Sequence, residues 1–124
     1  MPDPRVGDVW DVDFDPRMGN EQGGIRPALV VSGADFNAIP HRLRIVIPIT
    51  GTDKGLSNQV RIEAPEGGLT KPSVVMCEQV KSQSLVRFQR KRGTVTAQTL
   101  ETVQRLVGLF IDRPTTDSTA SETI

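Results

Sequence analysis

The sequence passes from a polar, glycine-rich loop directly into an apolar strand in the stretch Gly19-Asn20-Glu21-Gln22-Gly23-Gly24-Ile25-Arg26-Pro27-Ala28-Leu29-Val30-Val31-Ser32. The short run from Pro27 to Ser32 is apolar until its last residue, which is typical of a buried strand. The segment Gly7 to Phe14 precedes the loop, and its residues alternate along the chain. This alternation predicts a half-buried strand ending at Asp15-Pro16, with Trp10, Val12 and Phe14 on one side and Val9, Asp11 and Asp13 on the other.

Further strands are expected downstream of this stretch. Leu43 to Thr50 places Leu43, Ile45, Ile47 and Ile49 on one face, and Pro48 within it lacks a backbone donor, so we expect an edge strand or a bulge there. The remaining elements are expected as strands over Gln59 to Glu63, Ser73 to Val80 (central) and Gly93 to Val95, a connector over Leu85 to Phe88, and one helical turn over Ala34 to Ile39.

Helical spacing appears near the end of the chain. Thr96 is expected to cap this helix and Pro114 cannot continue it. The apolar stripe consists of Leu100, Val103, Val107 and Phe110, widened by Leu106 and Ile111. Together the elements predict a mainly β, barrel-like domain of five to seven short antiparallel strands with a C-terminal α-helix, over residues 1–113. The polar, Ser/Thr-rich residues 114–124 are expected to be a disordered tail.

The charge balance gives no simple argument for a nucleic-acid partner. The chain of 124 residues has 15 basic and 15 acidic residues and a formal net charge of zero. A local basic patch can nevertheless bind phosphate while acids gather elsewhere. The acidic residues do occur early (Asp3, Asp8, Asp11, Asp13 and Asp15), whereas basic residues concentrate later, in Arg42/Arg44 and in Arg87-Arg90-Lys91-Arg92.

The apolar runs and the cysteine content of the sequence indicate the cellular compartment and exclude several kinds of site. The N-terminus Met1-Pro2-Asp3-Pro4-Arg5 has no apolar signal region, and no apolar run approaches the roughly 20 residues that span a bilayer. The single cysteine, Cys77, excludes an internal disulfide and leaves too few thiols for a structural zinc site. We therefore expect a cytoplasmic protein without membrane contact and without a metal or other cofactor.

Three candidate sites are better explained as structural features. Asp11, Asp13 and Asp15 resemble the start of a calcium loop, but the positions that require Gly and Glu hold Pro16 and Gln22. A solvated strand face is the better interpretation of these acids. His41 is the sole histidine and lies in a polar loop, and Cys77 follows apolar residues on an expected central strand, so both are interpreted mainly as structural.

The glycine-rich loop offers chemistry of its own. Gly23 and Gly24 allow positive φ angles and a close approach of the backbone to a ligand, with N–H groups free to face it. Arg26 stands at the start of a strand with its backbone restricted by Pro27, and such a fixed arginine can present a planar fork of donors to a phosphate. From these residues alone, a surface hairpin with an ion pair between Glu21 and Arg26 explains the pattern equally well.

The order of these blocks resembles the MazF/PemK toxins of toxin–antitoxin modules. The resemblance rests on Gly7-Asp8-Val9-Trp10, Val12-Asp13-Phe14-Asp15-Pro16, Gly19-x-Glu21-Gln22-Gly23-Gly24-x-Arg26-Pro27-Ala28-Leu29-Val30-Val31-Ser32, Phe36-Asn37, Ile47-Pro48-Ile49-Thr50 and Val75-Met76-Cys77-Glu78-Gln79-Val80. It extends from Gly7 to about Ile111 and implies an SH3-like β barrel with a C-terminal helix.

The resemblance also implies a function: a sequence-specific, metal-independent endoribonuclease that cuts single-stranded RNA. The ribose 2′-OH is the nucleophile, and the products carry a 2′,3′-cyclic phosphate and a 5′-OH. A homodimer and a MazE-like antitoxin, which fills the RNA groove with an acidic segment, are implied as well. By position, Arg26 and Thr50 correspond to the residues that carry catalysis in the family.

Physical chemistry supports these assignments. Attack by the 2′-OH builds negative charge on the phosphorane oxygens, which Arg26 can neutralise and to which Thr50 can donate a hydrogen bond. Glu21 can either accept the 2′-OH proton or orient Arg26 through an ion pair. The residues expected to contact RNA are Gln22, Gly23, Gly24, Ser32, Glu78 and Gln79, the last two by reading base edges of an unpaired strand.

Two other functions remain open from the sequence. A gyrase-poisoning toxin of the CcdB type shares the barrel without being an enzyme, and would have no need of the glycine-rich loop together with Thr50. A peptide-binding SH3-like module needs a groove of exposed aromatic residues. The chain has no Tyr and one Trp, which disfavours this module.

Overall fold

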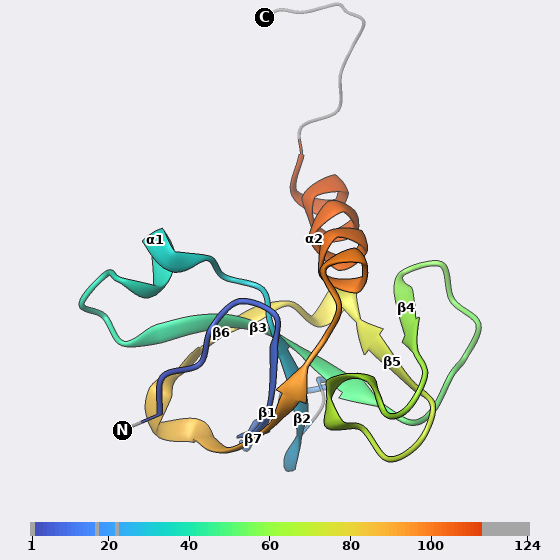
Figure 1. Cartoon of the computed structure of the whole chain (residues 1–124), viewed down its shortest axis with the longest axis horizontal. Helices are drawn as coiled ribbons and strands as arrows, with labels where there is room; N and C mark the ends of the chain where they lie inside the picture. Colours follow the sequence, from blue (N-terminus) through green and yellow to red (C-terminus); the bar gives the residue numbers. More distant parts are fainter. Residues whose placement is uncertain (1, 17, 22, 113–124) are drawn as a thin grey trace, which may run out of the picture.

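The structure, a computed structural model, describes residues 2–16, 18–21 and 23–112. These residues form seven antiparallel strands and a C-terminal helix (Figure 1). The strands are β1 (Asp8–Asp13), β2 (Ile25–Val30), β3 (Leu43–Thr50), β4 (Gln59–Ile62), β5 (Ser73–Met76), β6 (Lys81–Ser84) and β7 (Phe88–Thr94). The helices are α1 (Ala34–Asn37) and α2 (Ala97–Ile111), and the 3₁₀ turns are η1 (Glu66–Gly68), η2 (Cys77–Gln79) and η3 (Leu85–Arg87).

The strands pair in the order β4-β5-β3-β2-β1-β7, and β6 pairs with β3 outside this order. The sheet curls into a barrel-like shape that hydrogen bonds do not close within the described residues, since β4 and β7 are not neighbours. The predicted mainly β, barrel-like fold with a C-terminal helix is thus confirmed. The predicted tail, residues 114–124, lies outside the described residues.

Both faces of the sheet are buried, which the alternation in β1 did not predict. Val9 was expected on the outer side, yet it is fully buried in a core between the sheet and α2, together with Leu29 and Ile47. Val12 and Phe14 lie in a second core, against which Trp10 packs. Trp10 meets Phe88 edge to face at 5.9 Å, and its indole N–H donates to Asp8. Trp10 therefore belongs to the packing, as expected.

The strand that carries Pro48 is central, so the predicted edge position is wrong. β3 has exactly the predicted bounds and pairs with β2 on one side. Its other side pairs first with β6, up to Val46, and then with β5 from Ile49 onward. Pro48 falls between these two partners, where neither β6 nor β5 pairs with β3. The N–H that proline lacks therefore leaves no hydrogen bond of the sheet unmade on that side.

The segment predicted as one strand over Ser73 to Val80 is divided. β5 ends at Met76, and the turn η2 redirects the chain into β6, which the sequence did not predict. β6 escaped prediction because Lys81–Ser84 is polar, although Gln83 is buried. Cys77 is buried in the core as expected, and this burial, reinforced by the charge of Glu78, raises the pKa of its thiol to about 11.

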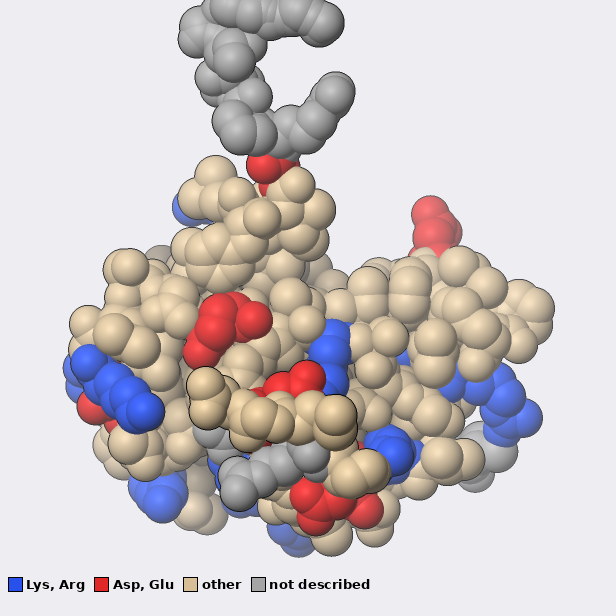
Figure 2. All heavy atoms as spheres, turned by 180° about the vertical axis from the view of Figure 1, so that it is seen from behind, with Lys and Arg blue, Asp and Glu red and all other residues tan. Residues whose placement is uncertain are grey.

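The late basic cluster faces the early acidic cluster across one strand pair. β7 is longer than the predicted strand at Gly93 to Val95, and it pairs with β1. Asp11 binds Arg92 at 3.1 Å and Arg90 at 3.3 Å, and Lys91 lies 3.4 Å from Asp8. Figure 2 shows one face of the molecule, on which Lys and Arg side chains are interspersed with Asp and Glu side chains. Charges separated in the sequence therefore largely compensate in space.

The C-terminal helix begins as predicted. The Thr96 side chain accepts a hydrogen bond from the Thr99 N–H at 3.1 Å and so caps α2. Val103 and Val107 are buried against the sheet, whereas Phe110 and Ile111 are exposed, because the C-terminal end of α2 stands clear of the sheet (Figure 1). No helix in the described ranges has the length and apolarity needed to cross a membrane.

Candidate functional site

Two open cavities meet at Arg26 and Thr50, which line both. The first, here called the cationic cavity, has a volume of about 390 Å³ and is also lined by Gly51, Thr70, Lys71, Ser73 and Arg92. The second, here called the amide cavity, has a volume of about 770 Å³ and is also lined by Asn20, Lys54, Gln59, Glu78 and Gln79. The two residues predicted to carry catalysis therefore occupy the junction of the cavities.

The strand register explains this juxtaposition. In the ladder between β2 and β3, Ala28 pairs with Pro48 and Leu29 with Ile47. Extending this antiparallel register by two residues places Arg26 opposite Thr50, with both side chains on the same face. Two positions far apart in the sequence are thus held together by the backbone of adjacent strands.

The guanidinium of Arg26 retains donors for a ligand. Its Nε donates to the carbonyl oxygen of Gly23 at 3.1 Å, which fixes the side chain over the start of β2. Within the described part of the chain, Arg26 has no ion pair with a carboxylate. The half-buried side chain therefore presents its terminal N–H groups as a preorganised fork for a phosphate.

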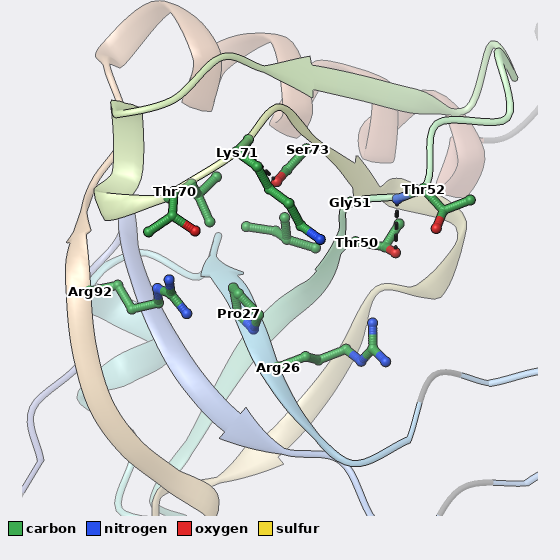
Figure 3. Close-up of a pocket in the computed structure, with 11 residues that line it drawn as sticks. Arg26, Pro27, Thr50, Gly51, Thr52, Thr70, Lys71, Ser73 and Arg92 are labelled. Carbon is green, nitrogen blue, oxygen red and sulfur yellow. Dashed lines mark hydrogen bonds between the residues drawn. The ribbon is translucent and has the colours of Figure 1, made fainter.

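The hydroxyl of Thr50 is oriented by the backbone that follows it. The Thr52 N–H donates to Thr50 Oγ1 at 3.3 Å. Since the oxygen accepts this bond, its own hydrogen is available to donate to an anionic oxygen in the adjoining cavity. Figure 3 shows Arg26 extending below Thr50, with Lys71 reaching down from above Pro27 and Arg92 on the other side of Pro27 from Arg26.

Gly24 uses its backbone groups within the protein rather than for a ligand. Gly24 has the predicted positive φ, 75°. Its N–H donates to a carboxylate oxygen of Asp15 at 2.7 Å, and its carbonyl accepts from the Phe14 N–H at 2.9 Å. The expectation that this amide is free to face RNA is therefore wrong for Gly24. The carbonyl of Gly23 positions Arg26, and Gln22 lies outside the described residues.

Glu21 contacts a different cation from the one expected. One of its carboxylate oxygens accepts from the Met18 N–H at 3.0 Å, and the other lies 3.6 Å from the Lys81 ammonium. The predicted ion pair with Arg26 is not formed between these two described residues. Glu21 instead lines a smaller cavity of about 150 Å³ with Glu78, Gln79 and Lys81.

Ser32 is placed away from the site, which corrects its assignment as an RNA contact. It follows the C-terminal end of β2, whereas Arg26 lies at the N-terminal end of this six-residue strand. Ser32 is 4% exposed, and its hydroxyl donates to Asn37 at 2.6 Å and accepts from the Ile45 N–H at 3.0 Å. The hydroxyl is thus used to join α1 to β3.

Glu78 and Gln79 are brought to the site as expected. Both lie in the turn η2 and line the amide cavity with Arg26 and Thr50. They also line the cavity that contains Glu21, so they bridge the two spaces. Carboxylate and amide groups at this position can exchange hydrogen bonds with the edges of an unpaired base.

The sequence did not single out several residues that line the cavities. They lie in connecting segments or singly within strands, where polar and charged side chains carry no periodic signal. The structure alone brings them to the site: Asn20, Thr52, Lys54, Gln59, Thr70, Lys71, Ser73 and Arg92. No group of three potential metal ligands occurs among the residues that the structure describes.

The chain resembles known proteins in both sequence and fold. Residues 5–111 match the family model described as the PemK-like, MazF-like toxin of type II toxin–antitoxin systems. The chain belongs to this family. Among its relatives is Endoribonuclease MazF9 of Mycobacterium tuberculosis, which is 34% identical over 87% of this chain and 96% of the relative.

Other family members match over a similar share of the chain. Endoribonuclease toxin MazF of Escherichia coli K12 is 33% identical over 87% of this chain and 94% of its own length. The crystal structure of MazF from Deinococcus radiodurans superposes with a TM-score of 0.79, at 29% identity, over 90% of this chain and 98% of that one. A MazE-MazF structure from the same organism has a TM-score of 0.72 at 29% identity, covering 90% and 97%.

Proposed function

We propose that this chain is an endoribonuclease toxin that cleaves single-stranded RNA at the junction of the cationic and amide cavities. The observation that carries the proposal is that Arg26 and Thr50 line both cavities and have donors free for a ligand at the junction. The endoribonuclease names of the relatives support the same activity. A gyrase-poisoning toxin has no use for this pair, and the matched family disfavours it.

The reaction follows from the available groups. The 2′-oxygen attacks the adjacent phosphorus, the bond from phosphorus to the 5′-oxygen breaks, and the products carry a 2′,3′-cyclic phosphate and a 5′-OH. Arg26 faces the charge that develops on the nonbridging oxygens, and Thr50 donates a hydrogen bond to one of them. Because both are fixed by strand pairing, little reorganisation accompanies the rise in charge.

Two protons must move during this reaction. The 2′-OH loses one, and the leaving 5′-oxygen gains one. Glu78 lines the same cavity as Arg26, whereas Glu21 lines the neighbouring smaller cavity. We assign removal of the 2′-OH proton to the carboxylate of Glu21 or Glu78. The guanidinium of Arg26 gives a proton to the leaving 5′-oxygen, and exchange with solvent restores both groups.

The amide cavity is assigned to base recognition. Gln59, Glu78 and Gln79 present amide and carboxylate groups there beside the apolar Leu56 and Met76. An unpaired base can pack on the apolar side chains while its edge exchanges hydrogen bonds with the polar ones. Duplex RNA shields those edges, so a single-stranded substrate fits this cavity best.

The proposal extends to partners and compartment. The MazE-MazF structure of Deinococcus radiodurans is a precedent for an antitoxin partner. We infer that this chain binds a MazE-like antitoxin whose acidic segment occupies the cavities that otherwise take RNA, since both ligands are anionic and extended. We further propose a homodimer acting in the cytoplasm.

The test is cleavage of a mapped RNA in EDTA by the full chain and by two variants. Removing a preorganised donor to a developing oxyanion lowers rates by about 100-fold or more, so Arg26→Ala and Thr50→Val should each show at least this loss. Arg105→Gln, an exposed change on α2, serves as the control and should cleave at the original rate. Cleavage that needs a divalent metal, or that survives Arg26→Ala, would overturn the proposal.

A further inference from the structure

The cationic cavity contains more positive charge than cleavage at the junction requires. Arg26, Lys71 and Arg92 line it, and no Asp or Glu is among its described lining residues. The three cations come from β2, from the segment before β5 and from β7, and all three line one cavity. In Figure 3, Lys71 and Arg92 point toward the space around Pro27, whereas the Arg26 side chain extends away from Arg92. In a chain with zero net charge, such an unbalanced cavity indicates an anionic ligand.

Lys71 is available to that ligand. It forms no ion pair within the described residues, although its carbonyl oxygen accepts from the Ser73 hydroxyl. Its side chain crosses Gly51: a Cβ at Gly51 would lie 2.6 Å from Lys71 Cε and 2.9 Å from Nζ. The missing side chain at Gly51 thus leaves room for the lysine stem and places the ammonium group close to the end of β3.

The positive charge of Arg92 is only partly compensated by its ion pair. Its Nη1 binds one oxygen of Asp11, and Arg90 binds the other oxygen of the same carboxylate. One negative charge shared between two guanidinium groups leaves this corner of β1 and β7 positive. Asp11 also holds the Arg92 side chain, which is 19% exposed, in a fixed position beside the cavity.

The segment that carries Thr70 and Lys71 is itself held in place. A Cβ on Gly68 would lie 2.5 Å from the carbonyl carbon of Arg92, and one on Gly93 would lie 2.7 Å from the carbonyl carbon of Gly67. Only glycine permits η1 to pack this closely on β7. Glu66 in the same turn also accepts from the Thr96 N–H at 2.9 Å, so the cavity is largely preformed.

We propose that the cationic cavity is a second phosphate subsite, in which Lys71, Arg92 and Thr70 hold the backbone phosphate next to the one being cleaved. This inference rests on the proposed function. The cleaved phosphate lies at Arg26 and Thr50, the nucleotide on one side enters the amide cavity, and the phosphate on the other side enters the cationic cavity. The amide cavity then reads sequence, whereas the cationic cavity supplies affinity without sequence preference.

The test pairs a variant with a modified substrate. Lys71→Gln removes the exposed ammonium, and Lys71→Arg keeps the charge. The substrate is an oligonucleotide with one ribose, at the mapped cleavage position, and deoxyribose elsewhere. A neutral methylphosphonate replaces the neighbouring phosphate on either the 5′ or the 3′ side. Arg105→Gln removes the same charge at an exposed residue that lines neither cavity and is the matched control.

We expect Lys71→Gln to raise KM about tenfold with kcat nearly unchanged, and Lys71→Arg to restore most of the loss. For the original protein, the methylphosphonate on one of the two sides should raise KM by a similar factor. For Lys71→Gln, the same methylphosphonate should raise KM little further. The slope of log(1/KM) against log salt concentration should become shallower by about 0.7, the contribution of one contact to a single strand.

The opposing results are distinct from failure of the proposed function. If Arg26→Ala abolishes cleavage but Lys71→Gln matches Arg105→Gln in KM and salt dependence, the second subsite is wrong and the endoribonuclease stands. The subsite would also be wrong if the rise in KM from Lys71→Gln and the rise from the methylphosphonate multiplied, whether the methylphosphonate stood on the 5′ or on the 3′ side of the cleaved bond. If the original protein cleaves no RNA, the proposed function fails first.

Discussion

Replacing Gly68 by alanine tests how the turn η1 is packed. Gly68 has a φ of 72°, and an alanine forced to adopt it loses about 1 kcal/mol of stability. The new Cβ would lie 2.5 Å from the carbonyl carbon of Arg92, which is backbone and cannot rotate away. Forcing this overlap costs about 2 kcal/mol more. We therefore expect Gly68→Ala to lower the free energy of unfolding by about 3 kcal/mol.

Gly55→Ala separates the two causes. Gly55 has a similar φ of 68°, but a Cβ there meets nothing within 4 Å. In urea unfolding followed by circular dichroism at one protein concentration, the midpoint should fall by about 2 M for Gly68→Ala and by at most about 0.7 M for Gly55→Ala. Because the turn positions Lys71, Gly68→Ala should also raise KM for RNA. Equal midpoints for the two variants would refute the packing of η1 on β7.

Three further results are expected. Cys77 should resist iodoacetamide at pH 8 in the native protein and react in urea, because folding raises its pKa from 9.0 to about 11. The free energy of unfolding should therefore keep its full value below pH 9 and fall as the pH rises toward 11, where the unfolded thiol loses its proton first. Partial burial raises the pKa of Glu66, but hydrogen bonds from the Thr96 N–H and from the Thr99 and Thr96 hydroxyls outweigh it and hold the pKa below 4.5. Glu66→Gln should therefore lower the urea midpoint at pH 7, with a difference that vanishes as acid protonates the carboxylate; a midpoint difference independent of pH would contradict this. If Glu78 rather than Glu21 removes the 2′-OH proton, Glu78→Gln should lower kcat by about 100-fold or more, while Glu21→Gln leaves it nearly unchanged; the reverse result assigns the base to Glu21.

The strands with apolar periodicity were predictable, and those without it were not. β3 follows its predicted bounds because apolar side chains recur along it, and α2 begins at its predicted cap. β6 and most of β7 were missed, because polar and basic side chains cover them and their stability comes from pairing with β3 and β1. Such pairing depends on the neighbour in the sheet and leaves no local pattern.

The site shows the same division between local and distant causes. The stretch from Glu21 to Pro27 pointed to Arg26, and the structure places Arg26 beside Thr50. Proximity in the sequence nevertheless suggested a contact between Glu21 and Arg26, whereas Glu21 meets Lys81. A turn can direct two nearby side chains apart, while a strand pair can bring distant ones together.

The sequence by itself determined the glycine-rich loop, the buried strand that follows it and the restricted backbone of Arg26 before Pro27. These features arise from steric and periodic preferences that act over a few residues. The tertiary structure alone decided that Gly24 donates to Asp15 and that Lys71 and Arg92 join Arg26 around one cavity. Those contacts depend on strand register and on the close packing of η1 against β7, which unite segments remote in the chain.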